Sequence, residues 1–317
     1  MGTANWRETA IPVARRPRGV IVTILGTGSP LGTPVLGCGC ETCEAAREFG
    51  IERTRAGIHV TNERTGEVLL IDAGPDVRWQ LASAERDANR ERGCGYRLPD
   101  AVVITHVHFD HCAGLDDLIH YRESLPVYAA DGTGLTVPEP NAGASVAAVL
   151  DEQFGYAETL SIRARTPYES FEACGLEVTL VPVDHGQMAC YGVCVVDPVS
   201  ETKLAITSDT SYAISERSRT TFSDSDLLIA ESLVPASVEG EWPTDRPGKR
   251  VKPTWNHPGA EGTPRSLRGS HLTHEGALAL ADDVGAKRVR LVHASQYYPA
   301  DRAFDDPLAR DGERWEL

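Results

Sequence analysis

The chain has 317 residues, a formal net charge of −15 at pH 7 and a sequence pI near 5.1. Hydrophobic residues make up 41% of it and charged residues 24%, which is typical of a globular protein and provides enough apolar side chains for a sizeable core. The acidic balance repels phosphate backbones and no apolar run is long enough to span a bilayer, so we expect neither a nucleic-acid partner nor a membrane span.

Residues 1–18 are polar and contain no apolar segment of the kind that secretory signals have, so we interpret them as an N-terminal extension. An apolar run at 20–25 predicts a strand, and the glycine-rich segment Gly26-Thr27-Gly28-Ser29-Pro30 follows it. No Gly-Lys-Ser/Thr follows, which makes a phosphate-binding loop a weak interpretation. We expect this loop to lie at the edge of a site instead.

Three of the eight cysteines lie within six positions, in Cys38-Gly39-Cys40-Glu41-Thr42-Cys43. The other five are scattered, which is typical of a reducing, cytoplasmic location and not of a disulfide framework. Three thiols this close favour a closed structural zinc site. The alternative is three reduced surface thiols, although exposed free cysteines are normally avoided.

Three histidines and one aspartate occupy the segment His106-Val107-His108-Phe109-Asp110-His111, directly after an apolar run at 101–104. The run predicts a buried strand, so these side chains lie where a strand ends and a loop begins. Imidazole and carboxylate ligands suit zinc, manganese or iron. Four such groups cannot all bind one ion with good geometry. We therefore assign His106 and His108 to one ion, and Asp110 and His111 to an adjacent one.

This pattern, His106-x-His108-x-Asp110-His111, resembles the signature of the metallo-β-lactamase superfamily. The resemblance implies an α/β fold, a four-layer αββα sandwich of two pseudo-repeated halves, with a two-metal site at one edge of the paired sheets. It also implies a further histidine, a bridging aspartate and a last histidine at strand ends. The chain supplies these residues in that order, as His185, Asp209 and His293, each after an apolar run.

A strand at 67–71 ends in Asp72, which we expect to orient a metal-bound histidine. The next segment, Gly74-Pro75-Asp76-Val77-Arg78, is predicted to open a helix and resembles protein B of pyrroloquinoline quinone biosynthesis. The cysteine spacing resembles that family and the phosphoribosyl cyclic phosphate phosphodiesterases of carbon–phosphorus lyase pathways. In the phosphodiesterases a histidine completes the cysteine site, and Gln296 stands at that position here. The fourth ligand is therefore open, with His257, His274 and Asp301 as candidates.

The remaining pattern predicts a pseudo-duplicated sandwich within residues 19–317, and not two independent domains. Helices are expected at 114–121, 142–154 and 273–284, and strands at 127–130, 175–184, 191–197, 203–208 and 227–230. A loop insertion at about 238–270 contains five prolines. Between 245 and 270 it has six basic and two acidic residues. We interpret Arg246 and Arg250 as binding an anionic substrate, with a solvated basic loop as the equal alternative.

Two metal ions about 3.5–4 Å apart can hold a water between them and lower its pKa, so no side-chain nucleophile is needed. No Gly-x-Ser-x-Gly motif occurs. His271, just before the helix at 273–284, resembles the general acid of the phosphodiesterases and of tRNA 3′-processing nucleases. Glu231 would be its carboxylate partner and keep imidazolium available near pH 7. We count Asp110 with these two as catalytic; the alternative for His271 is a helix-start residue with no chemistry.

These residues favour a metal-dependent hydrolase, a phosphodiesterase that acts on a small phosphate ester, cyclic or linear, through a dimetal-bound hydroxide. The alternative is an iron-dependent hydroxylase or oxygenase in cofactor or natural-product biosynthesis, as the quinone-biosynthesis resemblance implies. The negative charge weakens a third interpretation, a tRNA-processing nuclease. We expect a small anionic substrate as the partner, and the chain could assemble as a homodimer.

Overall fold

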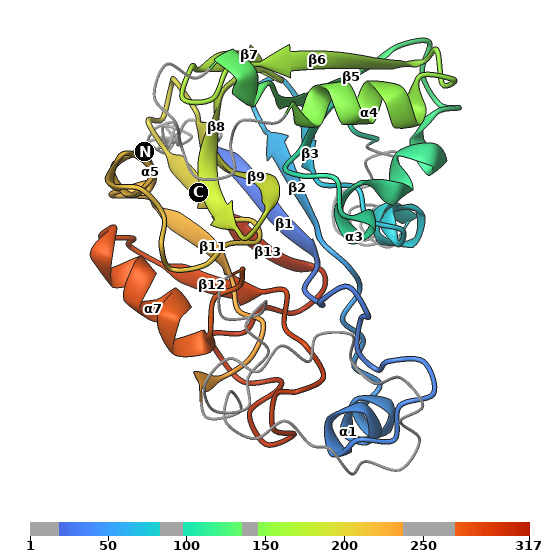
Figure 1. Ribbon diagram of the computed structural model, residues 1–317, viewed down its shortest axis with the longest axis vertical. Coiled ribbons are helices and arrows are strands. Elements are labelled where there is room, and N and C mark those ends of the chain that lie inside the picture. The colour runs from blue at the N-terminus through green and yellow to red at the C-terminus, as the bar shows by residue number, and fades with distance from the viewer. Residues whose placement is uncertain (1–18, 83–97, 135–144, 237–269) are drawn as a thin grey trace, which may run out of the picture.

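The computed structural model describes residues 19–82, 98–134, 145–236 and 270–317, which form two β-sheets packed face to face (Figure 1). The first sheet has seven strands in the order β13-β1-β2-β3-β4-β5-β6. Their bounds are β1 Val20–Gly26, β2 Gly57–Asn62, β3 Val68–Ile71, β4 Ala101–Ile104, β5 Leu125–Ala130, β6 Leu160–Arg165 and β13 Glu313–Glu316. Strands β1 to β3 pair antiparallel, and β3 to β6 pair parallel.

The second sheet has six strands in the order β12-β11-β10-β9-β8-β7. Their bounds are β7 Phe171–Ala173, β8 Leu176–His185, β9 Met188–Val196, β10 Lys203–Ile206, β11 Leu227–Glu231 and β12 Val289–Val292. Strands β7 to β10 pair antiparallel, and β10 to β12 pair parallel. Each sheet thus runs from antiparallel to parallel pairing along the chain, as the expected pseudo-repeat requires.

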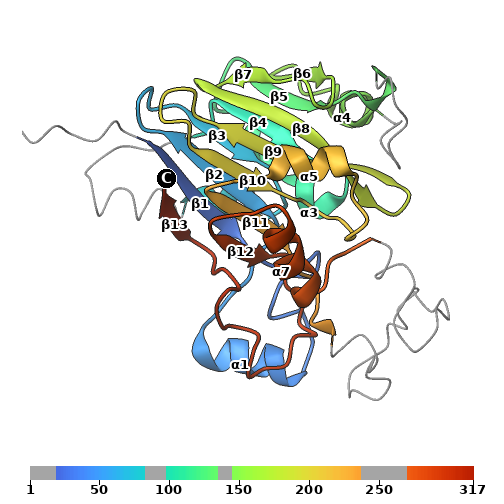
Figure 2. The same ribbon diagram turned by 90° about the vertical axis from the view of Figure 1, so that its left-hand side faces the viewer.

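Helices cover the outer faces of the two sheets, which completes the αββα layering (Figure 2). Helix α4 (Val146–Phe154) packs against β5 and β6, α5 (Glu216–Phe222) against β8, and α7 (His274–Asp283) against β11 and β12. Shorter elements are α3 (Phe109–Cys112), the 3₁₀ helices η1 (Ala113–Leu118) and η2 (Gly132–Gly134), and a helical segment at 77–82. The helix expected at 114–121 is therefore wrong: a short 3₁₀ turn takes its place. Helix α1 (Glu41–Phe49) lies away from the sandwich in both views.

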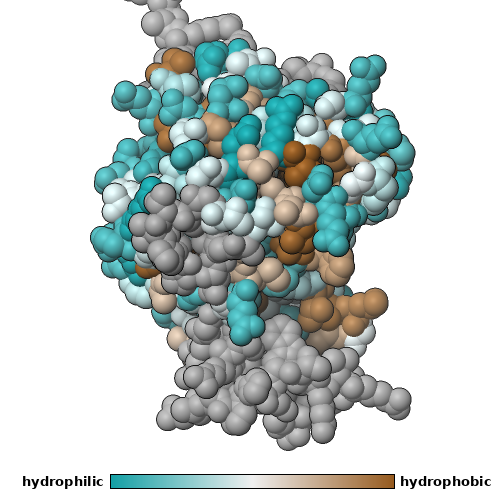
Figure 3. All heavy atoms as spheres, turned by 45° about the horizontal axis from the view of Figure 1, so that its top comes forward, coloured by the Kyte–Doolittle hydropathy of each residue, from teal (hydrophilic) through white to brown (hydrophobic). Residues whose placement is uncertain are grey.

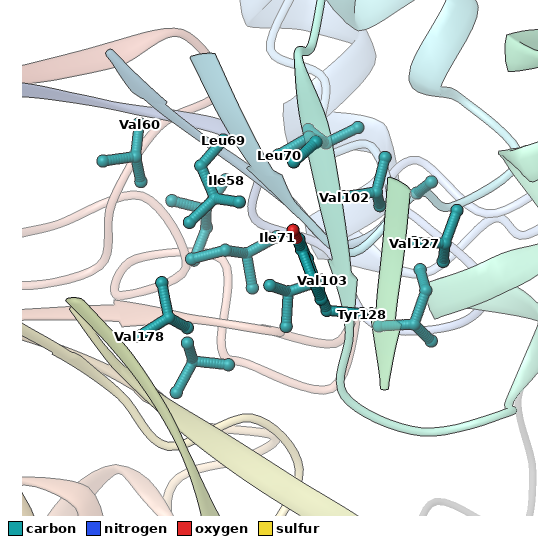
Figure 4. Packing of buried hydrophobic residues seen from close by; sticks show 14 of the residues in the cluster. Ile58, Val60, Leu69, Leu70, Ile71, Val102, Val103, Val127, Tyr128 and Val178 are labelled. Atoms are coloured by element: carbon teal, nitrogen blue, oxygen red, sulfur yellow. The ribbon is translucent and has the colours of Figure 1, made fainter. Parts of the chain in front are cut away.

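The main hydrophobic core lies between the sheets and explains why the central strands are apolar on both faces. Every residue of β3 and β4 is buried. Figure 4 shows Ile71 and Val103 of these strands packed toward Val178 of β8 in the opposite sheet. Because parallel strands in a sandwich are covered by the other sheet on one side and by helices on the other, they need near-continuous apolar sequence.

Three polar residues within two positions of a strand end have left-handed backbone conformations, which non-glycine residues rarely adopt. Asp72 follows β3 with φ 60°, Ser208 follows β10 with φ 55°, and His293 follows β12 with φ 60°. Such conformations persist only where surrounding contacts hold them, and they gather at functional sites. All three residues lie at the same edge of the sandwich as the His106–His111 segment, which follows β4.

The pairing of the C-terminal strand β13 with β1 was not anticipated from the sequence. Trp315 pairs with Val22 in an antiparallel register. The predicted extension at 1–18 and most of the predicted insertion at 238–270 lie outside the described residues. No helix in the described part of the chain is long and apolar enough to cross a membrane.

Candidate metal centre

The structure brings the seven predicted ligands together in two groups that share Asp209. The first group consists of His106, His108, His185 and Asp209, whose ligand atoms lie within 4.8 Å of one another. Here Nδ1 of His108 lies 3.1 Å from Nε2 of His106 and 3.2 Å from Nε2 of His185. The Oδ2 atom of Asp209 lies 3.7 Å from Nε2 of His106 and 3.8 Å from Nε2 of His185. Three nitrogen atoms and one carboxylate oxygen therefore converge on one point.

The second group consists of Asp110, His111, His293 and the same Asp209. The Oδ1 atom of Asp209 lies 3.5 Å from Nε2 of His111 and 3.4 Å from Nε2 of His293. The Nε2 atom of His111 is buried without a hydrogen-bond partner. An orphaned buried acceptor facing two carboxylates is costly unless a cation completes it. The two oxygens of Asp209 thus face different groups, as a bridging carboxylate would.

The Nδ1 atoms of two of these histidines are occupied by acceptors, which leaves Nε2 free to bind metal. His111 donates from Nδ1 to Oδ2 of Asp72 at 2.7 Å, and His185 donates from Nδ1 to the carbonyl oxygen of Ser270 at 2.8 Å. A carboxylate or carbonyl on the second ring nitrogen fixes the tautomer and the ring orientation of a metal-binding histidine. Asp72 therefore contacts a predicted metal-binding histidine, as we expected from the sequence. The contact from Ser270 was not predicted, because backbone carbonyls have no sequence signal.

Burial and local charge shift the histidine pKa values in opposite directions in the two groups. Burial lowers the pKa of His106, His108 and His185, which favours the neutral, metal-binding form of the first group. Burial also acts to lower the pKa of His111, but the carboxylates of Asp209, Asp72 and Asp110 outweigh it and raise that pKa. Cationic charge placed here is therefore favoured, and a divalent ion would supply it.

Two hydroxyl groups join the halves of the sandwich behind the cluster, and sequence reasoning missed both. Thr105 donates from its backbone N–H to Oδ1 of Asp72 and from its hydroxyl to Oδ2, both at 2.9 Å. Ser208, from the other half, donates its hydroxyl to that of Thr105 at 2.9 Å. Asp72 is thus held in place from β4 and β10. The run Thr105–His106 and the strand end at Ser208 could have suggested this link, but many buried hydroxyls have similar contexts.

Glu231 and His271 form the predicted pair beside the cluster. Nδ1 of His271 lies 2.9 Å from Oε2 of Glu231, and Glu231 also accepts the backbone N–H groups of Thr210 and Leu272. Burial lowers the pKa of His271, and burial followed by the charge of Asp209 raises that of Glu231. The lowered pKa of His271 argues against the expectation that this pair by itself keeps imidazolium available near pH 7, because burial outweighs the charges of Asp209 and Asp110. His271 lines the pocket beside the cluster, and its contact with Glu231 is through Nδ1.

The sulfur atoms of Cys38, Cys40 and Cys43 also lie within 4.8 Å of one another, beside α1. The backbone N–H of Val35 points at Sγ of Cys43 at 3.3 Å, the kind of contact that stabilises a thiolate. Hydrogen bonding to Cys40 and burial raise the pKa of Cys43, the behaviour of crowded thiols with no cation between them. The donor set fits a structural zinc ion.

Of the three candidates for a fourth cysteine-site ligand, the two that the structure describes do not join this group. Neither His274 nor Asp301 does so in the described part of the chain, and His274 lies beside Tyr298 instead. His257 lies outside the described residues. Gln296 lies beside the cysteines, since its backbone carbonyl oxygen is 3.8 Å from Sγ of Cys40. The side-chain oxygen of Gln296 is buried and has no hydrogen-bond partner. The fourth position remains open to this side chain.

The metal cluster opens into a pocket of about 690 Å³, within the usual size range of small-molecule sites. Asp110, His271 and Pro30 of the glycine-rich loop all line it. Arg55, which the sequence analysis did not single out, is the one arginine or lysine among the described lining residues. Asp76 orients this guanidinium, with its Oδ2 atom 2.9 Å from Nε. Arg246 and Arg250 lie outside the described residues, so their predicted role stays a prediction.

Comparison with known proteins agrees with this architecture. Two solved structures overlay on 94% of the chain: a "new diphosphatase from the PhnP family" (TM-score 0.65, 24% identity, 97% of that chain) and Zn²⁺-bound PqqB from Methylobacterium extorquens (TM-score 0.70, 21% identity, 100% of that chain). At these identities the overlay shows the fold alone.

Sequence comparison gives shorter matches. Coenzyme PQQ synthesis protein B of Cupriavidus necator is 30% identical over 168 residues, which is 51% of this chain and 46% of that protein. The chain spans less than half the length of the first curated relatives that it matches. The family model described as "Beta-lactamase superfamily domain" matches residues 68–294, which include all seven predicted metal ligands. The chain therefore belongs to the β-lactamase superfamily and has the metallo-β-lactamase fold.

Proposed function

We propose that this protein is a dinuclear metal-dependent phosphodiesterase acting on a small anionic ester. The observation that carries the proposal is Asp209, whose two carboxylate oxygens face two separate groups of ligands. His106, His108 and His185 would hold one ion with it, and Asp110, His111 and His293 the other. When bound, two divalent ions supply an activated water and polarise the oxygen under attack.

The side chains around the cluster supply the remaining functions. Arg55 presents a fixed positive charge to an anionic substrate, and Arg246 and Arg250 are proposed to add to it. Asp110, which lines the pocket, is proposed to accept a proton as water attacks. His271 is proposed to donate a proton to the leaving oxygen, while Glu231 fixes its ring through Nδ1. Binding of cations and substrate in the site would set the protonation of this pair during turnover.

A second candidate function is an oxygen-dependent step in biosynthesis. The likeness of 168 residues to Coenzyme PQQ synthesis protein B favours it. The two candidates differ in the ions they can use, because redox chemistry with oxygen needs a redox-active ion such as iron, whereas hydrolysis also proceeds with redox-inert zinc.

The experiment loads chelator-treated protein with zinc, manganese or iron in turn. Each sample is assayed on bis(p-nitrophenyl) phosphate and, with a reductant, for oxygen consumption. Hydrolysis by the zinc or manganese form, with about two ions per chain beyond any ion on the cysteines, supports the phosphodiesterase. Oxygen consumption by the iron form without ester hydrolysis by any form would replace it with the oxygenase.

A further inference from the structure

Part of the lining of the pocket above the cluster is apolar, and nothing in the proposed chemistry uses it. One of these apolar residues is Phe109, the first residue of α3, which lies in the sequence between the predicted ligands His108 and Asp110. The side chain is 71% exposed, although water contact with a phenyl ring is unfavourable. Backbone hydrogen bonds from His111 and Cys112 to the carbonyl of His108 hold this turn, so the ring is kept beside the ligands.

Single exposed apolar residues are common on protein surfaces, so the exposure of Phe109 alone assigns no role. Three further apolar side chains line the same pocket, and each comes from a different segment. They are Pro30 from the glycine-rich loop, Pro75 after β3 and Met188 at the start of β9. In the space-filling view of Figure 3, hydrophobic residues likewise reach the surface in small groups among hydrophilic ones.

The segment of Pro75 packs directly against the segment of Phe109. A Cβ atom added to Gly74 would lie only 2.4 Å from the carbonyl oxygen of Asp110. Only glycine permits this approach, which places the proline next to the metal-binding turn. Rigid proline and phenylalanine faces with an adaptable methionine make a surface that suits a flat apolar group.

From this arrangement we propose that the pocket has a subsite for a flat apolar group, such as an aromatic ring, attached to the phosphorus centre of the substrate. Phe109 stacks on that group while the cluster and Arg55 bind the anionic oxygens. The proposal deepens the proposed function and rests on it for the identity of the anion. It assigns Phe109 to substrate specificity and gives it no part in bond cleavage.

The test measures binding of two inert anions to the full-length, metal-loaded protein by calorimetry. Phenylphosphonate and methylphosphonate carry the same anionic group and differ in the ring. We expect the wild type to bind phenylphosphonate about 5–10-fold more tightly, the range that an aromatic contact provides. Phe109→Ala should reduce this preference to less than about twofold, and Phe109→Tyr, which keeps a ring, should retain it.

Phe49→Ala is the matched control, because Phe49 ends α1, is 66% exposed and is not among the described lining residues. This variant should keep the full preference. Equal binding of both phosphonates by the wild type, binding of neither, or an unchanged preference in Phe109→Ala would each overturn the subsite.

These outcomes are separable from those that test the proposed function. Ester hydrolysis without a ring preference would overturn the subsite alone. A ring preference that depends on Phe109, in a protein that hydrolyses no ester, would keep the subsite and overturn the phosphodiesterase.

Discussion

The two clusters of metal-binding side chains in this chain are built in opposite ways. The three cysteines come from six consecutive positions beside α1, outside the sandwich. The histidine and aspartate cluster gathers residues from 106 to 293, which lie after strands of both sheets or, for Asp110 and His111, in α3 after β4. A local cluster of this kind stabilises its own segment and the residue that fills its fourth position. A cluster that spans the fold can hold reacting groups from several directions, as catalysis needs.

This difference predicts which property of the protein a substitution in each cluster should change. Changes in the cluster between the sheets should alter metal content or turnover, and changes in the cysteine cluster should alter stability. The four substitutions below test this division, beginning with the largest expected effect.

Asp209→Ala removes the carboxylate shared by both groups, so we expect loss of at least one ion per chain. Turnover on bis(p-nitrophenyl) phosphate should fall by about 10³-fold or more, since even one lost electrostatic contact costs about 10²–10³-fold. Metal content by mass spectrometry and steady-state rates measure both effects. Glu152→Ala on α4, an exposed position, is the control. Full metal content and activity in Asp209→Ala would contradict the bridging role.

His271→Ala should lower turnover without removing metal, because the residue is proposed to donate a proton and not to bind an ion. A positioned acid contributes about 10²–10⁴-fold, and most of it for poor leaving groups. An alkyl phosphodiester should therefore lose far more rate than a p-nitrophenyl ester, whose leaving group departs without a proton. Equal losses on the two esters, or loss of metal, would show that His271 is a ligand or a structural residue.

Asp72→Asn should weaken one ion and spare the other. The amide cannot replace both acceptor oxygens, so His111 loses the partner that fixes its Nδ1 tautomer. Loss of such a partner costs about 10–100-fold in metal affinity. Stepwise competition with a zinc indicator resolves the two ions. Asp100→Asn is the matched control, because Asp100 lies at the opposite end of β4 and accepts the Val68 N–H. Weakening of both ions equally would argue against this pairing.

Cys40→Ser should remove one zinc ion per chain and lower the free energy of unfolding by about 3 kcal/mol or more, because loss of a bound metal is among the large destabilising changes. Urea unfolding and zinc analysis measure these effects, and the turnover of the folded protein should stay unchanged. Cys174→Ser, at a buried cysteine outside the cluster, controls for the cost of the new hydroxyl. Equal destabilisation by both variants, with equal zinc, would mean that the cysteines hold no ion.

Much of the fold followed from apolar runs that end in polar residues. The runs at 101–104 and 227–230 predicted β4 and most of β11, because buried strands need continuous apolar sequence. The segment at 114–121 was predicted to be a helix, but the structure has the 3₁₀ helix η1 (Ala113–Leu118) there. Strand β13, with the sequence Glu-Arg-Trp-Glu, has no apolar run at all, and only pairing with β1 makes it a strand.

In the candidate site, too, some features could be predicted from the sequence and others could not. The sequence by itself determined the spacing of His106, His108, Asp110 and His111, because a strand end and one turn fix how far apart these side chains lie. Only the tertiary structure decided that Asp209 faces both groups, and that burial outweighs the charges of Asp209 and Asp110 and lowers the pKa of His271. It also decided that Arg55 and Phe109 line one pocket. The physical reason is that burial and converging hydrogen bonds depend on segments joined only when the two sheets pack.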